Sequence, residues 1–293
     1  MKFGSLLILS RSYEKIRKYV LRLEELGFDS VHAPDHLIGQ QQKDSPWLEA
    51  ITVMSALAVE TSTIKLSFAV LCNSFRNPAY LAKVISTLDH ISNGRMLMWL
   101  GAGWNKKEYR QYGYPFPKAP VRVDQLEEAL TIYKKMFTED QFSFEGKFWN
   151  LKRTLNYPKP VQKPYPQIVL GTTGLRMTDI ACREADGINI MFAFQMKDIP
   201  ERISLIKENL KKYNRDLSEF EISILYPVTL VKSQEELDKF SERERTNAFI
   251  GFPEDIKERF AVLEDLGVKK ILTVAVTSPD FDDPLKVFAD KVM

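Results

Sequence analysis

The chain has 293 residues, a formal net charge of +2, and a hydrophobic content of 44%. That content is enough for a large core, and the near-neutral charge gives no basic excess for binding nucleic acid. Cys72 and Cys182 are too few for a disulfide scaffold, so we expect a reducing, cytoplasmic environment. The apolar stretch at 3–9 is too short for a signal peptide or a membrane span and predicts a first strand.

Strand-like and helix-like segments alternate along the chain. Apolar residues at helical spacing predict helices over 12–26, 47–59, 78–91, 121–137, 175–184 and 199–213. Short apolar runs predict strands at 3–9, 28–33, 64–71, 96–100, 167–170, 187–191, within 220–231, and at 271–276. This alternation favours parallel pairing, and about eight units in this length predict a (β/α)8 TIM barrel rather than an open sheet.

The stretch over 138–166 interrupts the alternation. Residues 142–149 alternate in polarity and contain a turn at Glu145-Gly146, which predicts a hairpin. Several prolines follow and exclude a helix there. We interpret the stretch as an insertion before the fifth strand, within a single domain spanning 1–293.

Two predicted strands end in glycine-rich turns. Gly101, Ala102 and Gly103 end the fourth strand, where bare backbone can approach a ligand; the alternative is a tight turn without one. Lys106 occupies the place of the third glycine of a dinucleotide fingerprint, which argues against a Rossmann site. The fifth strand ends in a second turn, which leads into a helix and is formed by Gly171, Thr172, Thr173 and Gly174. Amides and hydroxyls there suit a phosphate, or a threonine simply caps the helix.

Polar and aromatic residues near other strand ends are further candidates. Asp35 and His36 follow the second strand and could position a cofactor or move a proton; alternatively, Asp35 caps a turn and His36 is merely exposed. The chain has three histidines, none with acidic partners at metal-ligand spacing, so we expect no metal site. Aromatic residues that could wall a pocket for a planar ring, or simply pack, are Trp47, Trp104 and Tyr109.

Several of these segments together resemble the bacterial luciferase-like monooxygenase superfamily. The similarity covers nearly the whole chain, and its most specific element is a Ser-x-Gly-Arg sequence followed by Gly-x-Gly, with Asp-His upstream. The matching segments are 27–36, 77–78, 88–95, 100–105, 156–162, 185–189 and 251–255.

The resemblance implies a (β/α)8 barrel that uses either reduced FMN with oxygen or the deazaflavin coenzyme F420 as a hydride carrier. The length of 73–78 and the sequence Gly-Ala-Gly-Trp-Asn look closest to the deazaflavin branch. It also implies a non-prolyl cis peptide at Ala69-Val70 or Val70-Leu71, pressing on the middle of the ring. By the same resemblance, Asp35 and residues 101–103 would line the cofactor, and residues 171–174 would hold its phosphate.

One departure from the family pattern concerns the proton donor. Sugar-phosphate dehydrogenases of this branch carry a glutamate directly after Gly-x-Gly, where this chain has Trp104, and Glu108 lies a turn further on. The departure argues against sugar-phosphate oxidation. We therefore expect an F420-dependent oxidoreductase for a small organic substrate, with His36 as acid–base residue and a homodimeric assembly. The alternatives are an FMN-dependent monooxygenase supplied by a separate flavin reductase, and a non-catalytic flavin-binding barrel.

Overall fold

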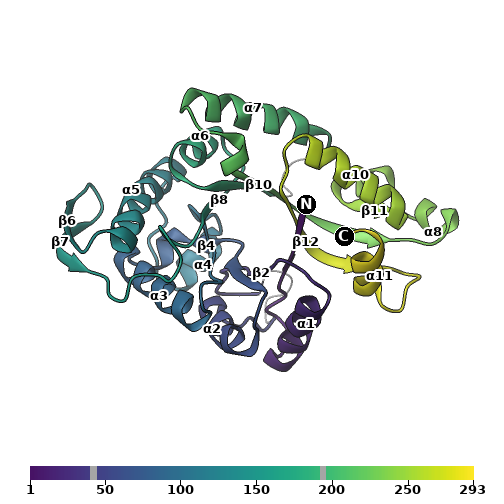
Figure 1. Ribbon diagram of the computed structural model, residues 1–293, viewed down its shortest axis with the longest axis horizontal. Helices are drawn as coiled ribbons and strands as arrows, with labels where there is room; N and C mark the ends of the chain where they lie inside the picture. The colour runs from purple at the N-terminus through teal and green to yellow at the C-terminus, as the bar shows by residue number, and fades with distance from the viewer. Residues whose placement is uncertain (40–44, 192–195) are drawn as a thin grey trace. The chain divides into compact units, whose positions relative to one another are not determined.

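The computed structural model describes residues 1–39, 45–191 and 196–293 (Figure 1). The chain divides into two compact units. The first unit comprises Met1–Leu7, Tyr19–His32 and Val169–Met293, and the second comprises Ile8–Lys18 and Ala33–Ile168. For the described residues, no helix is both long and apolar enough to cross a membrane.

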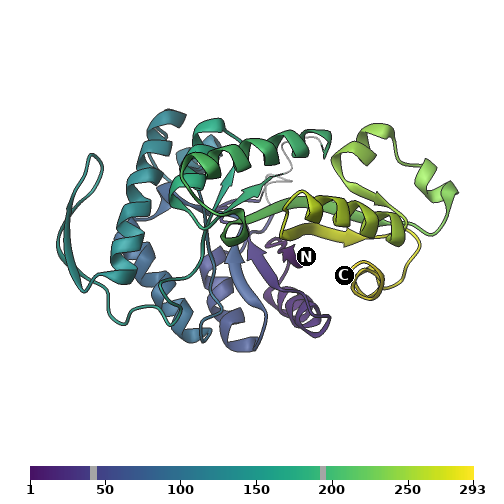
Figure 2. The same ribbon diagram turned by 45° about the horizontal axis from the view of Figure 1, so that its top comes forward.

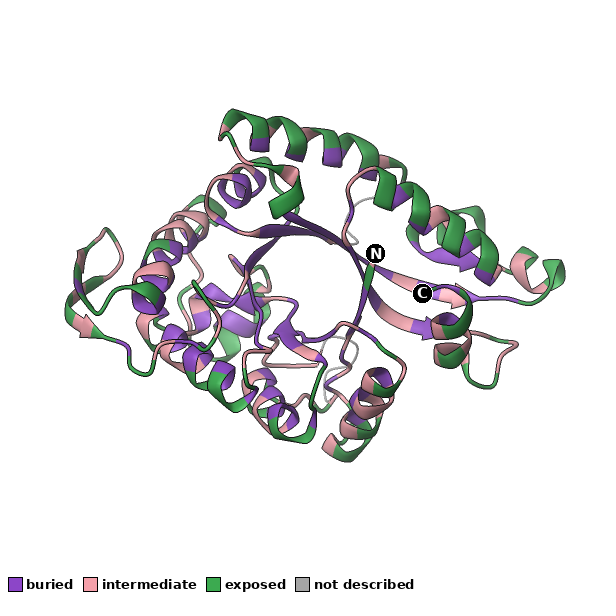
Figure 3. Ribbon diagram, viewed as in Figure 1, coloured by how far each residue is buried: buried purple, intermediate pink, exposed green. Residues whose placement is uncertain are grey.

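Parallel strands form the core of the first unit. Their order is β2 (Ser30–Ala33), β1 (Lys2–Leu6), β12 (Lys270–Thr277), β10 (Glu221–Leu230), β9 (Gly187–Ile190) and β8 (Ile168–Thr172), with β11 (Phe249–Gly251) also paired to β10. The helices are α6 (Leu175–Glu184), α7 (Ile199–Lys212), α8 (Gln234–Asp238), α9 (Glu242–Asn247), α10 (Pro253–Asp265) and α11 (Pro284–Lys291), and α1 (Tyr13–Glu25) begins in the second unit. Figure 3 shows the strands buried and one side of α7 exposed.

The second unit contains β3 (Lys65–Phe68), β4 (Leu71–Cys72) and β5 (Met98–Gly101). Its helices are α2 (Ala50–Glu60), α3 (Pro78–Ile91), α4 (Lys106–Gln111) and α5 (Ala119–Thr138), with a 3-10 turn η1 (Asn73–Phe75) after β4. Strands β4 and β5 run parallel, with Leu71 opposite Leu100 and Cys72 opposite Gly101. The ends of β4 and β5 therefore lie side by side.

Helix starts follow local capping chemistry. The predicted helix over 78–91 is confirmed, because the Asn77 side chain accepts hydrogen bonds from the amides of Ala79 and Tyr80 and Pro78 occupies the first turn. The helix expected from 47 begins instead at Ala50, because the Glu49 carboxylate accepts the amide hydrogens of residues 51 and 52. Sequence periodicity located the helix but not this cap.

Strand boundaries differ more from expectation. The third strand, predicted as continuous over 64–71, is split into β3 and β4 on either side of Ala69 and Val70. The short elements α4, α8, α9 and β11 carry too few residues to show a period, and the sequence did not predict them.

The predicted hairpin is confirmed as the antiparallel pair β6 (Gln141–Glu145) and β7 (Asn150–Leu155), with its second strand later than expected. Figures 1 and 2 both show it beside α5. The Glu128 carboxylate on α5 accepts the backbone N–H groups of Lys147, Phe148 and Trp149 at 2.9–3.2 Å. A carboxylate on the preceding helix therefore fixes the turn.

The Ser-x-Gly-Arg segment lies at the start of β5 and has a structural role. The Arg95 guanidinium donates to the carbonyl oxygens of Ala58, Thr61, Ile64 and Ser92 and to the Thr61 hydroxyl, all at 2.8–2.9 Å. Three of these acceptors belong to the C-terminal end of α2, where carbonyls lack helical partners and a cation is favourable.

Candidate active site at the strand ends

A non-prolyl cis peptide joins Ala69 to Val70, at the first of the two positions that the resemblance implied. The Ala69 amide donates to the Ala33 carbonyl at 3.0 Å, which ties this segment to the end of β2. Ala69 and Leu71 are buried, whereas Val70 is partly exposed. Val70 is therefore the member of this trio that a ligand can reach most readily.

The Asp35 carboxylate is occupied by protein partners rather than turned toward a ligand. Its side chain is 1% exposed and accepts two hydrogen bonds from Arg76, at 2.6 and 2.9 Å. It also accepts the Cys72 backbone N–H at 2.8 Å. Because Cys72 lies on β4, directly after the cis peptide, Asp35 supports the strand end on which the cofactor was expected to rest. The family resemblance had implied that Asp35 lines the cofactor.

Arg76 completes this buried ionic group. Burial disfavours its charge, but hydrogen bonds and charges from Asp35 and Glu49 outweigh that effect and raise the pKa of the guanidinium. Its second partner, Glu49, lies 3.0 Å away and also caps α2. Arg76 therefore links the start of α2 to the end of β2, a role that no sequence pattern indicated.

His36 directly follows Asp35 and has a different environment. Its Nδ1 lies 2.9 and 3.1 Å from the two carboxylate oxygens of Glu108. The Glu108 side chain is 2% exposed, whereas that of His36 is 20% exposed. Within the described part of the chain, Nε2 of His36 has no hydrogen-bond partner. A carboxylate on Nδ1 holds the proton there and leaves Nε2 as the nitrogen that can exchange a proton with a substrate.

Glu108 is the site residue that the sequence analysis noted without giving it a role. It lies in the first turn of α4, which begins after the N-cap Asn105. The pattern Asn-x-x-Glu is a helix-start signal and could have located this turn. It would not have revealed that the carboxylate turns to His36, because the two residues are 72 positions apart.

Two of the three aromatic candidates lie beside His36. The rings of Trp47 and Trp104 meet its imidazole edge-on, with centroids 6.1 and 5.8 Å away. Trp104 is 67% exposed and Trp47 is partly buried. Within the described residues, the indole nitrogen of Trp47 is buried without a hydrogen-bond partner. Both rings therefore lie beside the His36 imidazole.

Tyr109 does not line an open pocket as expected. It is fully buried in a cluster with Cys72 and Phe75, and its hydroxyl shares a hydrogen bond of 3.2 Å with the Cys72 sulfur. Burial raises the pKa of the Cys72 thiol to about 11 and also raises the pKa of Tyr109. Both groups stay protonated at neutral pH, so the pair is unreactive and serves to pack the strand end.

Gly103 shows what the glycine-rich end of β5 accommodates. Its φ is +80°, and a Cβ built on it would lie 1.9 Å from the Tyr109 hydroxyl oxygen. Its carbonyl accepts a hydrogen bond from Arg122 on α5 at 3.1 Å. Glycine is therefore required here by backbone conformation and by a protein side chain. The neighbouring Gly101 is buried, and Ala102 is partly exposed.

The second glycine-rich turn belongs to the first unit and opens α6. Gly174, not a threonine, is the N-cap residue, so the alternative of an ordinary threonine cap is wrong. The Thr172 hydroxyl oxygen accepts the Gly174 amide at 3.2 Å and is directed to this turn. Arg202 donates to the Thr173 carbonyl at 2.6 Å. Thr173 and Gly174 are exposed, so the helix N-terminus is open to an anionic ligand.

The fold and the polar strand ends are those of a (β/α)8-barrel protein, as predicted, since such barrels carry their sites at the carboxyl ends of the strands. The model for the luciferase-like monooxygenase family matches residues 1–243. The chain therefore belongs to this family, in agreement with the resemblance.

Relatives of known activity use two different cofactors. An F420-dependent glucose-6-phosphate dehydrogenase from Amycolatopsis mediterranei (strain U-32) is 31% identical over 58% of this chain and 51% of its own length. An FMNH(2)-dependent dimethylsulfone monooxygenase from Pseudomonas putida is 33% identical over 47% of this chain and 38% of its own length. The chain thus spans about half or less of these two relatives.

A solved structure extends the comparison along the chain. An F420-dependent secondary alcohol dehydrogenase in complex with an F420-acetone adduct is similar with a TM-score of 0.85, over 99% of this chain and 98% of that one. Its sequence identity is 19%, so the likeness concerns the fold.

Proposed function

We propose that this protein is an F420-dependent oxidoreductase that transfers hydride between the coenzyme and a small organic carbonyl or alcohol, with His36 exchanging the accompanying proton. The observation that carries the proposal is the His36–Glu108 pair. Hydride addition to a carbonyl leaves an alkoxide that needs a proton, and alcohol oxidation needs the reverse. A histidine held at Nδ1 and open at Nε2 suits either direction.

The residues of the second unit fit a flat cofactor ring. The strand end around Ala69, Val70 and Leu71 offers backbone and apolar surface, and Ala102 and Gly103 are partly exposed at the end of β5. We propose that these residues contact the ring, with Asp35 and Arg76 holding their strand end in place. In the first unit, the exposed residues at the start of α6 suit an anionic group such as a phosphate. When bound, F420 supplies the hydride-carrying ring carbon.

Within such a site, the chain itself has three tasks. Val70 and the glycine-rich end of β5 orient the ring face toward the substrate. The two tryptophan rings exclude water from the imidazole and favour an apolar substrate next to it. Glu108 is a positioning residue, since it fixes the His36 tautomer and stabilises the imidazolium that forms when Nε2 takes a proton.

Cofactor titration tests the first part of the proposal. The purified protein is titrated side by side with F420 and FMN, each oxidised and reduced, and binding is followed by cofactor fluorescence. We expect F420 to bind at least about tenfold more tightly than FMN and its reduced form to exchange hydride with members of a panel of alcohols and carbonyls. Preferential FMN binding with oxygen consumption would support the monooxygenase alternative and refute the proposal. Tight F420 binding without any hydride exchange would indicate a non-catalytic binding barrel.

Substitutions test the acid–base assignment. We expect His36→Asn to lower kcat by about 10²–10⁴-fold while the cofactor Kd stays nearly constant. The matched control is His90→Asn, because His90 lies at the exposed end of α3, where its ring bonds the Lys159 carbonyl at 2.7 Å; its activity should be that of the wild type. Equal loss in both variants would contradict the assignment.

Glu108→Gln distinguishes positioning from packing. The variant keeps the shape of the side chain but can donate to Nδ1, so the tautomer of His36 should change and kcat should fall by about 10–100-fold. Nitrogen-15 NMR of the His36 ring reports the tautomer directly, with His36→Asn identifying its signals. An unchanged tautomer with reduced activity would refute the positioning role.

A further inference from the structure

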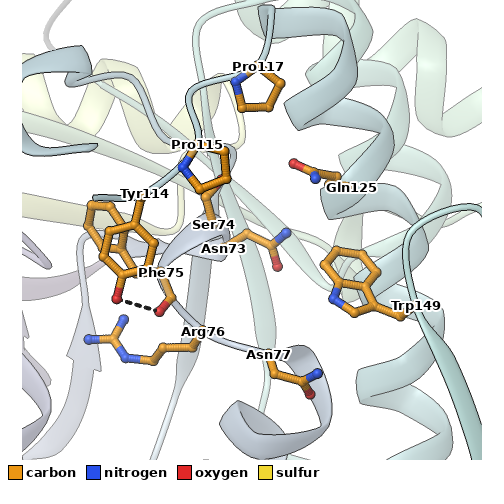
Figure 4. A pocket seen from close by; sticks show the side chains of 10 residues that line it. All are labelled: Asn73, Ser74, Phe75, Arg76, Asn77, Tyr114, Pro115, Pro117, Gln125 and Trp149. Carbon is orange, nitrogen blue, oxygen red and sulfur yellow. Dashed lines mark hydrogen bonds between the residues drawn. The ribbon is translucent and has the colours of Figure 1, made fainter. Parts of the chain in front are cut away.

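A cavity with a volume of about 320 Å³ lies in the second unit, apart from the residues around His36 (Figure 4). It lies after β4, and its wall combines η1, the segment before α5, α5 itself and the β6–β7 hairpin. None of His36, Glu108, Trp47 or Trp104 contributes to it. The lining residues are Asn73, Ser74, Phe75, Arg76, Asn77, Tyr114, Pro115, Pro117, Gln125 and Trp149.

Asn73 presents an unused hydrogen-bond donor to this cavity. The residue is 1% exposed, and its Oδ1 accepts a hydrogen bond of 3.0 Å from the fully buried Tyr133 hydroxyl. Its Nδ2 is buried and has no partner within the described residues. Figure 4 shows this nitrogen on the side of Gln125 and Trp149. A buried donor without a partner is unfavourable, and a ligand acceptor at this place would satisfy it.

The charges around the cavity favour a neutral ligand. Of the lining residues, all of which the structure describes, Arg76 alone carries a charge. Its guanidinium is already paired with Asp35 and Glu49, at 2.6–3.0 Å. The remaining polar side chains are the amides of Asn73, Asn77 and Gln125, the hydroxyls of Ser74 and Tyr114, and the indole N–H of Trp149. An anionic ligand would find no unpaired cation among the lining residues, and a cationic ligand would find no lining carboxylate to pair with.

Trp149 supplies a flat aromatic surface. It stands at the turn of the hairpin, where its backbone N–H donates to Glu128 at 2.9 Å. Figure 4 shows its ring opposite the Asn73 amide across the cavity, with Pro115 and Pro117 on a further side. Aromatic faces favour planar partners, and a ring held by the hairpin turn loses little freedom on binding.

We propose that this cavity binds an uncharged planar ring bearing a carboxamide or lactam group. The ligand carbonyl accepts from Asn73 Nδ2, its N–H reaches the Gln125 or Ser74 oxygen, and the ring lies against Trp149. The site is separate from the one around His36, and the inference stands whether or not the protein uses F420.

Nicotinamide is a suitable probe, with two comparison compounds that each lack one required property. Nicotinate is a planar anion, and cyclohexanecarboxamide is neutral but not planar. We expect calorimetry or saturation-transfer NMR to give nicotinamide a Kd on the order of 1 mM and each comparison compound at least about fivefold weaker binding. Absence of saturable binding, or equal binding of all three compounds, would overturn the proposal.

Three variants locate the probe. Asn73→Asp keeps the acceptor for Tyr133 but removes the donor, and it should weaken nicotinamide binding by at least about tenfold. If this variant does not fold, Trp149→Leu on the exposed hairpin supplies the same test, with an expected loss of about five- to tenfold. The matched control is Trp104→Leu, which removes the same kind of side chain beside His36 and should leave the Kd unchanged. Loss of binding in Trp104→Leu but not in Trp149→Leu would overturn the proposal.

Discussion

The two ends of strand β5 use polar side chains in opposite ways. At its start, Arg95 directs its guanidinium to carbonyl and hydroxyl oxygens of the protein, with five hydrogen bonds of 2.8–2.9 Å. Beyond its end, Glu108 is buried but bonds a histidine whose other nitrogen has no partner within the described residues. The side chain at the start of β5 makes all its hydrogen bonds within the protein, whereas the pair beyond its end leaves Nε2 of His36 available to a ligand.

The first unit repeats this contrast. Lys270, which opens β12, is 1% exposed and pairs with Asp29 at 3.0 Å and with Glu221 at 3.6 Å. Just beyond the opposite end of β8, another strand of the same sheet, Thr173 and Gly174 are exposed. Strand starts in such folds maintain stability, and strand ends provide chemistry. The family signature over residues 92–105 therefore joins a stability element to a site element across one strand.

The largest change in stability is expected when the Arg95 hydrogen bonds at the start of β5 are removed. Arg95→Leu leaves carbonyls of α2 without their donor and should lower the free energy of unfolding by about 3–5 kcal/mol. Activity per folded molecule should stay at the wild-type value. Arg95 lies before the start of β5, whereas Glu108, the partner of His36, lies beyond its end. Urea denaturation with an activity measurement on the folded fraction checks both expectations.

Arg95→Lys serves as the control for charge. A lysine keeps the positive charge but cannot reach all five acceptors, so it should recover only a minor part of the loss. A destabilisation below about 1 kcal/mol in Arg95→Leu, or a specific loss of activity at full stability, would contradict the division between the two ends.

A comparison of two glycines, Gly103 and Gly113, tests how tightly the chain packs beyond the end of β5. Gly103 and Gly113 both have positive φ, of +80° and +74°, but a Cβ on Gly113 would meet nothing within 4 Å. Gly113→Ala should therefore cost about 1 kcal/mol of stability from backbone conformation alone. Gly103→Ala should cost about 3 kcal/mol, because its Cβ also collides with the Tyr109 hydroxyl. Thermal or urea unfolding measures the difference.

Removing the colliding atom gives the decisive control for this pair. Tyr109→Phe in the Gly103→Ala background deletes the hydroxyl and should recover a part of the additional loss. If Gly103→Ala and Gly113→Ala are equally stable, glycine is required at position 103 only for its backbone conformation.

The last prediction concerns the stability of the protein at alkaline pH. The Cys72 thiol keeps its proton in the folded protein up to a pKa of about 11, against an ordinary value of 9.0. Since the unfolded chain loses this proton first, the stabilising contribution is present below about pH 9 and is lost as pH rises toward about 11. The decline should be on the order of 2 kcal/mol. Unfolding measured at about pH 8 and about pH 10.5 should show it.

Cys72→Ser isolates the thiol from other alkaline groups. Serine does not titrate in this range and can still bond the Tyr109 hydroxyl, and burial, the largest cause of the raised pKa of Tyr109, is present in both proteins. The variant should therefore lose less stability than the wild type between the two pH values. Identical declines would show that the thiol does not contribute.

Much of the fold could be predicted from local sequence. The helices over 78–91 and 175–184 were predicted at their observed bounds, since capping and the helical period are both local properties. The break between β3 and β4 was not visible in apolar patterning, because Ala69 and Val70 are ordinary strand residues. Its cis peptide was anticipated from family resemblance alone.

The sequence by itself determined the alternation of strands and helices, the hairpin and the family, and it selected Asp35 and His36 as candidates. These follow from periodicity, turn chemistry and motifs, which need only neighbouring residues. Tertiary structure decided what each candidate does: Asp35 supports β4, His36 meets Glu108, and Tyr109 fills the space beside Gly103. The physical reason is that hydrogen bonds and burial depend on partners from other elements, which no local pattern specifies.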